Sequence, residues 1–248
     1  MNYKYDINKD FNNFKDFLLN IKEYFNTKNN YIHKARNELK IIPFKDLDTV
    51  VKSFKVPNII NKIAYTFFRD SKAKKSYEYS LKIGDFTPKP IGYIEFYENF
   101  LLNESYFISE KFDYDFTIRE PLLDKNFSDR ENIFRAFARF TYQLHQHQIL
   151  HKDYSPGNIL IKKENNDYTF KVVDINRMEF HPLSIKECLQ NFDKLWAKDD
   201  DLTIMIQEYA NISDLNVQDS IEKALYFSQK LKNFKNMKKR LKGKPVVD

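Results

Sequence analysis

The sequence predicts an α+β fold, in which a β-rich first part with one helix is followed by a helix-rich part with a small strand hairpin. Three observations predict it. Strand-like runs of β-branched and aromatic residues are concentrated before about residue 112, the clearest helical pattern begins near residue 128, and two short strand patterns follow that helix. The chain has 248 residues, of which 42% are hydrophobic, and this suffices for one large domain or two joined lobes.

The strands of the first part follow from its composition and from the residues that interrupt it. Residues 31–56 have the pattern of short strands, and the β-rich run over residues 48–54 is stopped by Pro57. Two more strands are expected over residues 91–97 and 106–112, where the sequence reads IGYIEFY and YFISEKF. These runs make the first part predominantly β-structured.

One helix is expected inside this β-rich part, over residues 71–82. Ser71 can cap its first turn, and apolar side chains then recur at every fourth residue. They are Ala73, Tyr77 and Leu81. Gly84 follows the last of them, so the helix is predicted to end there.

The second part opens with the clearest helix of the chain. Ser128 and Glu131 have the spacing of a capping box, which marks the start of this helix. Apolar residues then line one face as far as His147. They are Ile133, Phe134, Phe137, Phe140 and Leu144. Two short strands are expected next, over residues 158–162 and 169–174, and the remainder of the chain has a helical pattern.

The positive charge is concentrated at the end of the chain. Residues 230–248 hold eight cations and one acid, whereas the whole chain has a formal net charge of +6, so the rest is close to neutral. Nucleic-acid-binding domains usually spread a basic face over their body, so no nucleic-acid partner is expected. The predicted single domain, residues 1–248, therefore has a β-rich lobe over about residues 1–110, a helix-rich lobe over about 113–229, and this basic tail.

The cysteine content and the first residues indicate a compartment. Cys188 is the only cysteine, which fits a reducing environment. The opening segment MNYKYDINKDFNNF has charges throughout and lacks the apolar run of a secretory signal. No stretch approaches the roughly 18 apolar residues needed to span a bilayer. We therefore expect a cytoplasmic protein, in solution or on a membrane surface.

The chemistry is predicted by the segment HKDYSPGN, residues 151–158, and by Asp174 after the following pair of strands. Phosphoryl transfer needs a carboxylate that accepts the proton of the attacking hydroxyl, oxygen ligands for Mg²⁺, and a cation on the phosphates. Asp153 fits the catalytic base, and Asn158 and Asp174 fit the metal ligands. ATP and Mg²⁺ are therefore the expected cofactors.

The order of these residues is that of the kinase pattern H-x-D-x₄-N followed by D-F-G, with Asn176 in place of the glycine. Asn tolerates a left-handed backbone, so this replacement is physically mild. The competing interpretation of Asp153 is an acid that caps a turn, because the loop is rich in turn-forming residues. His151 is expected to brace the loop. The pattern and the element order together predict a two-lobed protein-kinase-like fold, with one αC-type helix in the β-rich N-lobe and a helical C-lobe.

A lysine on a strand and a glutamate on the next helix should complete the nucleotide site. Lys52 ends the run TVVK, which parallels the V-A-I-K strand of kinases. Lys55 would point to the opposite face and is the weaker candidate. Glu78, on the helix over residues 71–82, is the expected partner of Lys52. Its competing interpretation is a solvated charge in a lysine-rich segment.

Three departures from the protein-kinase pattern indicate an acceptor other than protein. Residues 31–48 contain no glycine, so the turn near Arg36 and Asn37 would have to cover the phosphates in another way. Ser155 stands where protein serine/threonine kinases usually carry lysine. No A-P-E segment follows Asp174. These departures favour a small-molecule or sugar kinase.

At this point the sequence resembles a known family. The stretches VVKSFKVPN, FFRDSKAKKSYE, LHQHQILHKDYSPGNIL and VVDINRMEF resemble those of the bacterial lipopolysaccharide kinases, the Kdo and heptose kinase group with its InaA-like members. The resemblance runs from about residue 32 to residue 197. The HxDxSPGNIL segment is shared more widely, including with aminoglycoside phosphotransferases, whereas the D-x-N-R run is more particular to this group.

The resemblance implies ATP-dependent phosphorylation of an inner-core sugar of lipid A-linked lipopolysaccharide, at the cytoplasmic face of the inner membrane. It also implies that backbone groups around Glu110–Phe112 meet the adenine. Arg177 falls in the D-x-N-R run, where a structural salt bridge is the competing role. Family members differ in their substrates, so the choice between Kdo and heptose stays open.

Two alternatives for function and two for the tail stay open as well. The chain could be an aminoglycoside-phosphotransferase-like kinase, or a pseudokinase that serves as a binding module, although Asp153, Asn158 and Asp174 are all present. Residues 230–248 could form a helix that rests on anionic lipid near a glycolipid acceptor. The competing state is a solvated or disordered tail.

Overall fold

The computed structural model describes residues 2–27, 31–34, 37–55, 58–165, 167–243 and 245. The chain divides into two compact units, each of which is described by itself. Unit 1 consists of Met1–Asp113 and Asp174–Asn176, and unit 2 consists of Tyr114–Val173 and Arg177–Asp248. Both units combine helices with strands, which confirms the predicted mixed composition.

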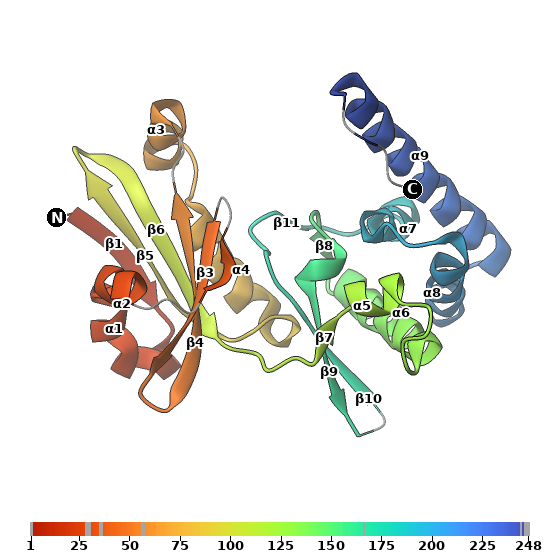
Figure 1. Ribbon diagram of the computed structural model, residues 1–248, viewed down its shortest axis with the longest axis horizontal. Coiled ribbons are helices and arrows are strands. Elements are labelled where there is room, and N and C mark those ends of the chain that lie inside the picture. The colour runs from red at the N-terminus through yellow and green to blue at the C-terminus, as the bar shows by residue number, and fades with distance from the viewer. Residues whose placement is uncertain are drawn as a thin grey trace. The chain divides into compact units, whose positions relative to one another are not determined.

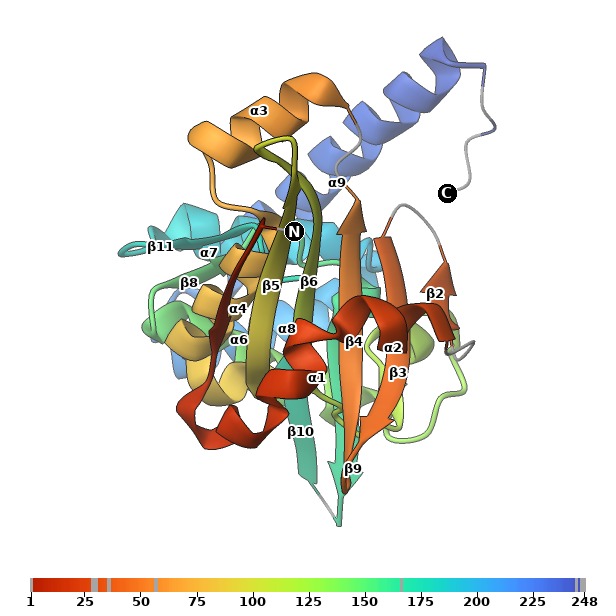
Figure 2. The ribbon, with the colours of Figure 1, turned by 90° about the vertical axis from the view of Figure 1, so that its left-hand side faces the viewer.

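Unit 1 is built on a six-stranded antiparallel sheet with the order β1-β5-β6-β4-β3-β2 (Figures 1 and 2). The strands are β1 (Asn2–Ile7), β2 (Tyr31–Lys34), β3 (Asn37–Phe44), β4 (Leu47–Lys55), β5 (Pro90–Glu98) and β6 (Leu101–Glu110). The strands predicted over residues 91–97 and 106–112 correspond to β5 and β6. The second of them ends two residues earlier than expected, at Glu110. Strand β1, which pairs with β5, was not predicted.

Helices cover both faces of this sheet. They are α1 (Lys15–Leu19), α2 (Ile21–Thr27), α3 (Ile59–Phe67) and α4 (Lys72–Ile83), with 3₁₀ turns at Lys9–Phe14 and Gly84–Phe86. The helix predicted over residues 71–82 is confirmed as α4. Ser71 accepts a hydrogen bond from the Lys74 N–H, and Gly84 ends the helix with a φ of 56°. The expectation of a single helix in this part is wrong, because α1, α2 and α3 are also present.

The alternation of side chains along β4 separates two cores. Val51 packs with residues of α1 and α2 in one buried cluster, which includes Phe17, Leu18 and Ile94. The other face packs against α4 through a smaller cluster. Its members are Phe54, Ala73, Tyr77 and Tyr93. Lys52 points to the α4 face, because it lies two residues from Phe54 on the same strand.

Unit 2 is mainly helical and carries two small sheets (Figure 1). A three-stranded sheet has the order β10-β9-β7, and a two-stranded ribbon joins β11 and β8. The strands are β7 (Phe116–Thr117), β8 (Ile149–His151), β9 (Ile159–Glu164), β10 (Asp167–Val172) and β11 (Met178–Phe180). The helices are α5 (Arg119–Leu123), α6 (Arg130–Gln146), α7 (Ile185–Asn191), α8 (Asp199–Ile212) and α9 (Val217–Leu241), with 3₁₀ turns at Pro156–Asn158 and Phe192–Leu195.

Helix α6 buries the apolar face that its sequence predicts, but it begins in a different way. The expected capping box of Ser128 and Glu131 is absent from the described structure, because Asp129 occupies the cap with a left-handed φ of 59°. The Asp129 carboxylate accepts hydrogen bonds from Asn132 and from the Tyr168 hydroxyl instead. Asp tolerates the left-handed region, so the chain turns into the helix here without a reciprocal cap.

The described part of the basic tail is helical. Residues 230–241 form the end of α9, which packs on α7 and α8 within unit 2. The Lys232 ammonium donates to the Ala197 carbonyl at 2.7 Å, and Lys239 lies over the Trp196 ring. The structure therefore describes these residues as helix and not as an unstructured tail. Over the described ranges, no helix combines the length and the apolar character required to cross a membrane.

Candidate active site

The predicted catalytic base, Asp153, lies in the loop between β8 and the 3₁₀ turn at Pro156–Asn158. His151 supports this loop from both ring nitrogens. Its Nδ1 accepts from the Asp153 backbone N–H at 3.1 Å, and its Nε2 lies 3.0 Å from the Val173 carbonyl oxygen. Because one nitrogen accepts and the other donates, these partners require the neutral ring with its proton on Nε2. This is the bracing position that the sequence assigns to His151.

Tyr154 anchors the same loop to helix α6. Its side chain is fully buried and its hydroxyl lies 2.8 Å from the Thr141 hydroxyl. Its ring packs parallel to that of Phe137, with 5.5 Å between the ring centroids. Burial raises the pKa of the Tyr154 phenol well above its ordinary value. Tyr154 is therefore a fixed, uncharged part of the core. The carboxylate of the preceding residue, Asp153, is partly exposed.

Asn158 is held in an orientation that suits a metal ligand. Its side-chain Nδ2 donates to the Asp153 carbonyl at 2.9 Å. The amide nitrogen is thereby committed to the loop, so the other end of the amide, Oδ1, points away from that carbonyl. An amide oxygen is a hard donor of the kind that Mg²⁺ accepts. Within unit 2, the Asn158 side chain is thus joined to the backbone of Asp153.

The chain reaches Asp174 through a firmly held residue. The Val173 N–H donates to the Asn158 carbonyl at 2.9 Å, and the Val173 carbonyl faces His151. Val173 thus pairs with both ends of the segment that carries Asp153. Asp174 is the next residue in the chain and belongs to unit 1.

Asp174 and Lys52 form an ion pair within unit 1. The Lys52 ammonium lies 2.8 Å from Asp174 Oδ1, and the exposed fractions of the two side chains are 15% and 34%. Lys52 also lies over the Phe54 ring, its neighbour on the same face of β4. Lys55 pairs with Glu38 and is largely exposed, as expected for the weaker candidate. The strand lysine of the prediction therefore meets the predicted metal ligand directly.

The left-handed residue of this segment is Asp174 and not Asn176. Asp174 has a φ of 58°, whereas Asn176 does not have a positive φ. The Asn176 side chain instead donates from Nδ2 to Asp174 Oδ1 at 2.7 Å. Asn176 therefore replaces the glycine because its amide group helps to orient the Asp174 carboxylate, and not because asparagine tolerates a left-handed backbone.

The predicted ion pair between Lys52 and Glu78 is not formed among the described residues. Glu78 lies on α4 but is 47% exposed, and its Oε1 is 3.7 Å from the Lys74 ammonium one turn earlier. The buried positions of α4 are Ala73, Ser76, Tyr77, Ser80 and Ile83. Glu78 follows Tyr77 by one residue, which is about 100° around the helix, and so turns away from this buried face.

The residues predicted to meet adenine lie at the end of β6, where unit 1 ends. The Glu110 N–H donates to the Lys89 carbonyl, and the Lys111 N–H donates to the Asp48 carbonyl, both at 2.9 Å. The segment is thus tied to the sheet as far as Lys111, and Phe112 follows it. Arg36, near the turn expected to cover the phosphates, lies outside the described residues, as does the side chain of Asn37.

Arg177 contacts the predicted base. Its Nη1 lies 3.4 Å from Asp153 Oδ2, with exposed fractions of 64% and 39% for the two side chains. A pair this exposed contributes little to stability, so its significance lies in where it holds the carboxylate. The neighbouring Lys152 ammonium donates to the Glu179 carboxylate on β11 at 3.1 Å.

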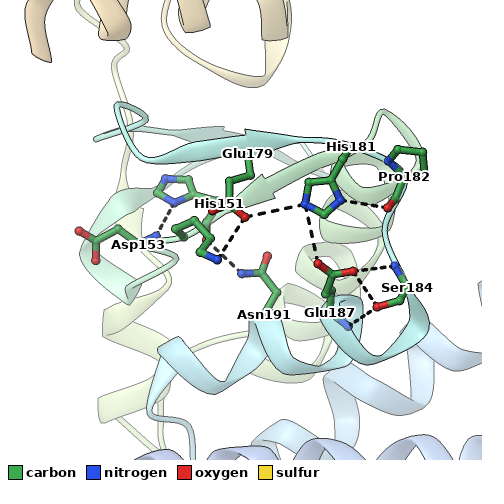
Figure 3. Close-up of polar contacts among 9 residues, drawn as sticks. His151, Asp153, Glu179, His181, Pro182, Ser184, Glu187 and Asn191 are labelled. Atoms are coloured by element: carbon green, nitrogen blue, oxygen red, sulfur yellow. Dashed lines mark hydrogen bonds and ion pairs between the residues drawn. The ribbon is translucent and has the colours of Figure 1, made fainter. Parts of the chain in front are cut away.

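A second set of polar groups supports the same loop, and no pattern in the sequence indicates it. Asn191 at the end of α7 donates from Nδ2 to the His151 carbonyl at 3.0 Å (Figure 3). Its Oδ1 faces His145 Nε2 at 3.2 Å, and His145 Nδ1 faces the Tyr209 hydroxyl at 2.9 Å. Burial lowers the pKa of His145 to about 4. A neutral histidine is therefore part of the support of the loop that carries Asp153.

The donor set fits Mg²⁺ better than a transition metal. The predicted ligands offer a carboxylate and an amide oxygen, which are hard donors. Over the ranges that the structure describes, His, Cys, Asp and Glu side chains do not gather in groups of three or more that could hold a metal.

The chain is similar to known proteins in its family pattern and in its fold. A search of curated proteins gives no match. Among solved structures, the chain is similar to one described as WaaP in complex with acyl carrier protein. The TM-score is 0.59 at 11% sequence identity, over 92% of this chain and 97% of that chain, which shows a shared fold. Residues 82–215, more than half of the chain, match the lipopolysaccharide kinase (Kdo/WaaP) family. The span of this match includes Asp153, Asn158 and Asp174, and the chain belongs to that family.

Proposed function

We propose that the protein is an ATP-dependent kinase that phosphorylates a hydroxyl of an inner-core sugar of lipopolysaccharide, either Kdo or heptose. The observation that carries the proposal is the geometry of the HKDYSPGN loop. Its histidine and asparagine hold the backbone on both sides of Asp153, within a chain of the lipopolysaccharide kinase family.

Asp153 is proposed as the general base. Its carboxylate would accept the proton of the attacking sugar hydroxyl, and Arg177 would hold that carboxylate from one side. Phosphoryl transfer depends mainly on positioning and on charge stabilisation, so a carboxylate held at a fixed point is sufficient. The two bonds of His151 and the bond of Asn158 fix that point.

Lys52, Asn158 and Asp174 are proposed to hold the nucleotide. Lys52 would bind the phosphates, and the oxygens of Asn158 and Asp174 would bind Mg²⁺. When bound, Mg²⁺ neutralises charge on the phosphates. Glu110 and Phe112 are proposed to contact adenine through their backbone groups. Glu78 has a weaker case as a phosphate-site residue, because it pairs with Lys74 on its own helix.

The acceptor and the location are proposed from the family, and the basic end of α9 adds support for the location. Family membership supports a lipid A-linked sugar as acceptor and work at the inner face of the inner membrane. The basic end of α9 supports contact with anionic lipid, because three cations stand in the last turn of the helix. The similar solved structure contains acyl carrier protein, so we propose that protein as a candidate partner to include in the assays.

The test is phosphate transfer from labelled ATP to a panel of lipid A–Kdo acceptors, heptose-containing cores and aminoglycosides, with and without Mg²⁺. Asp153→Asn should abolish transfer to the lipopolysaccharide acceptor. Asp167→Asn is the matched control: it changes an exposed carboxylate of unit 2, on β10, and should keep full activity. Phosphate transfer to aminoglycosides alone would contradict a lipopolysaccharide acceptor and would favour an aminoglycoside-phosphotransferase-like kinase.

A nucleotide thermal-shift assay separates an enzyme from a binding module. Stabilisation by ATP that requires Mg²⁺, and that Asp174→Asn removes, is expected. Stabilisation by ATP without any turnover on the panel would favour a pseudokinase. Absence of both stabilisation and turnover would overturn the kinase proposal.

A further inference from the structure

Helix α3 carries its apolar side chains on the outside of unit 1. It has no buried residue. Four of its large apolar side chains and the residue after it are exposed by 42% to 80%: Ile59, Ile60, Ile63, Phe67 and Phe68. Ile59, Ile63 and Phe67 follow one another at intervals of four residues, so they form a stripe along one side of the helix.

The polar side of α3 is the side that faces the protein. The Lys62 ammonium donates to Asn103 Oδ1 at 2.7 Å, and the Thr66 hydroxyl accepts from the Leu102 N–H at 2.9 Å. Both partners lie on β6, against which the helix packs. An ordinary surface helix turns its apolar stripe to the core and its polar residues to water. Helix α3 has the reverse orientation, which suits an apolar phase outside the protein.

The turn between β5 and β6 extends this surface (Figures 1 and 2). Phe100 at its tip is 86% exposed and has a φ of 64°, beside Asn99 with a φ of 47°. Two-residue turns with two positive φ angles favour Asn and Gly, so a phenylalanine is costly there. Phe100 precedes by two residues the Leu102 that bonds α3. A strained position that displays an aromatic ring to solvent indicates a use for that ring.

The charges around these side chains are positive. Residues 58–76 contain five cations and one acid, Asp70, and that acid pairs with Lys74 at 2.7 Å. Within α3 and the two residues that follow it, the only charged residues are Lys62 and Arg69. A helix that combines a large apolar stripe with cations and lacks acids is typical of an interfacial membrane helix.

We propose that these side chains form a membrane-binding element that inserts into the interface of a bilayer containing anionic phospholipid. The α3 surface is defined as Ile59, Ile60, Ile63, Phe67, Phe68 and Phe100. A second copy of the chain is a poorer occupant, because two such surfaces would bring cations together without acids to pair with them. One short helix and one turn are also small against the roughly 800 Å² per partner of a stable protein interface.

The lipid contact proposed for the basic end of α9 is separate from this one, which adds a second membrane contact to the proposed function and is tested without turnover. The full chain is sedimented with vesicles of phosphatidylcholine, alone or mixed with phosphatidylglycerol. We expect binding to the mixed vesicles that weakens with added salt. The double variant Ile63→Ser, Phe67→Ser should partition at least ~10-fold less, because two large apolar side chains lose their transfer to the interface.

The matched control is Leu123→Ser with Ile185→Ser, which removes two exposed apolar side chains of unit 2 and should bind as the unchanged protein does. A direct readout comes from Phe67→Trp in a Trp196→Phe background, since Trp196 is the only tryptophan. Its fluorescence should shift to the blue and be quenched by brominated lipid. Equal binding by both double variants, or no binding, overturns the proposal. So does a dimer that Ile63→Ser, Phe67→Ser dissociates in the absence of lipid.

Discussion

The buried histidine beneath the catalytic loop should make the stability of the fold depend on pH. His145 is 5% exposed and lies between the Tyr209 hydroxyl and Asn191 Oδ1. Asn191 donates to the His151 carbonyl through Nδ2, so its Oδ1 must accept, and His145 Nε2 must carry the proton. His145 Nδ1 then accepts from the Tyr209 hydroxyl. The folded protein therefore requires the neutral ring, and the perturbation we propose is His145→Gln.

The magnitude follows from the pKa of His145, which burial lowers from 6.5 to about 4. Because the folded-state pKa lies below the unfolded one, the unfolded chain takes up a proton first as the pH falls. The stability linked to the neutral ring is complete above pH 6.5 and is lost toward pH 4. At 1.36 kcal/mol per pKa unit, the loss is about 2 kcal/mol by pH 5 and about 3 kcal/mol by pH 4.

The assay is urea unfolding of the wild-type chain and of His145→Gln at pH 7, 6 and 5. The variant should be less stable at pH 7, because glutamine fits the two hydrogen bonds less well. The difference between the two proteins should shrink by about 2 kcal/mol at pH 5, since only the wild type loses the histidine contribution. His147→Gln, at the exposed end of the same helix, should keep the wild-type pH dependence. A difference between wild type and His145→Gln that stays constant from pH 7 to pH 5 would refute the reasoning.

Three further predictions concern stability at pH 7, measured as the free energy of unfolding in urea. Gly92→Ala should cost about 1–3 kcal/mol, because the added Cβ would lie 2.7 Å from the backbone oxygen of Asp6 on β1. Gly157→Ala should cost much less, because its Cβ would meet only the movable end of the Arg119 side chain. Asp201→Ala should cost about 3 kcal/mol, because it leaves the Arg130 guanidinium without its buried partner; a loss under about 1 kcal/mol would contradict this. Ser128→Ala should change stability by less than about 0.5 kcal/mol, because Ser128 does not cap the helix in the structure. A loss near 1 kcal/mol would instead indicate that Ser128 does cap it.

The elements that the sequence predicted well are those whose pattern is complete within the element itself. The buried face of α6 is visible as an apolar pattern within the helix itself. The cap of α4 and the glycine that ends it lie directly at the two ends of that helix. Strand β1 lacks such a pattern, since most of its residues are exposed and it exists by pairing with β5. Helix α3 was not predicted either, for a different reason. Its apolar stripe resembles that of a core helix, and only the bonds of Lys62 and Thr66 to β6 reveal that the stripe faces outward.

In the candidate site, too, contacts between residues close in the sequence could be predicted, and contacts between distant residues could not. His151, Asp153 and Asn158 lie within eight residues and interact through the backbone of one loop, so their spacing alone predicts their contacts. The partner of Lys52 lies 122 residues away, and spacing cannot distinguish a glutamate on the next helix from an aspartate after a distant strand.

Once Asp174 is known to be that partner, Asn176 also has a reason, because its amide orients the carboxylate that the lysine meets. Lys52 and Mg²⁺ are both positive and would share Asp174. Asp174→Asn should therefore weaken the binding of nucleotide and of metal together, whereas Lys52→Met should weaken nucleotide binding and leave the requirement for metal intact.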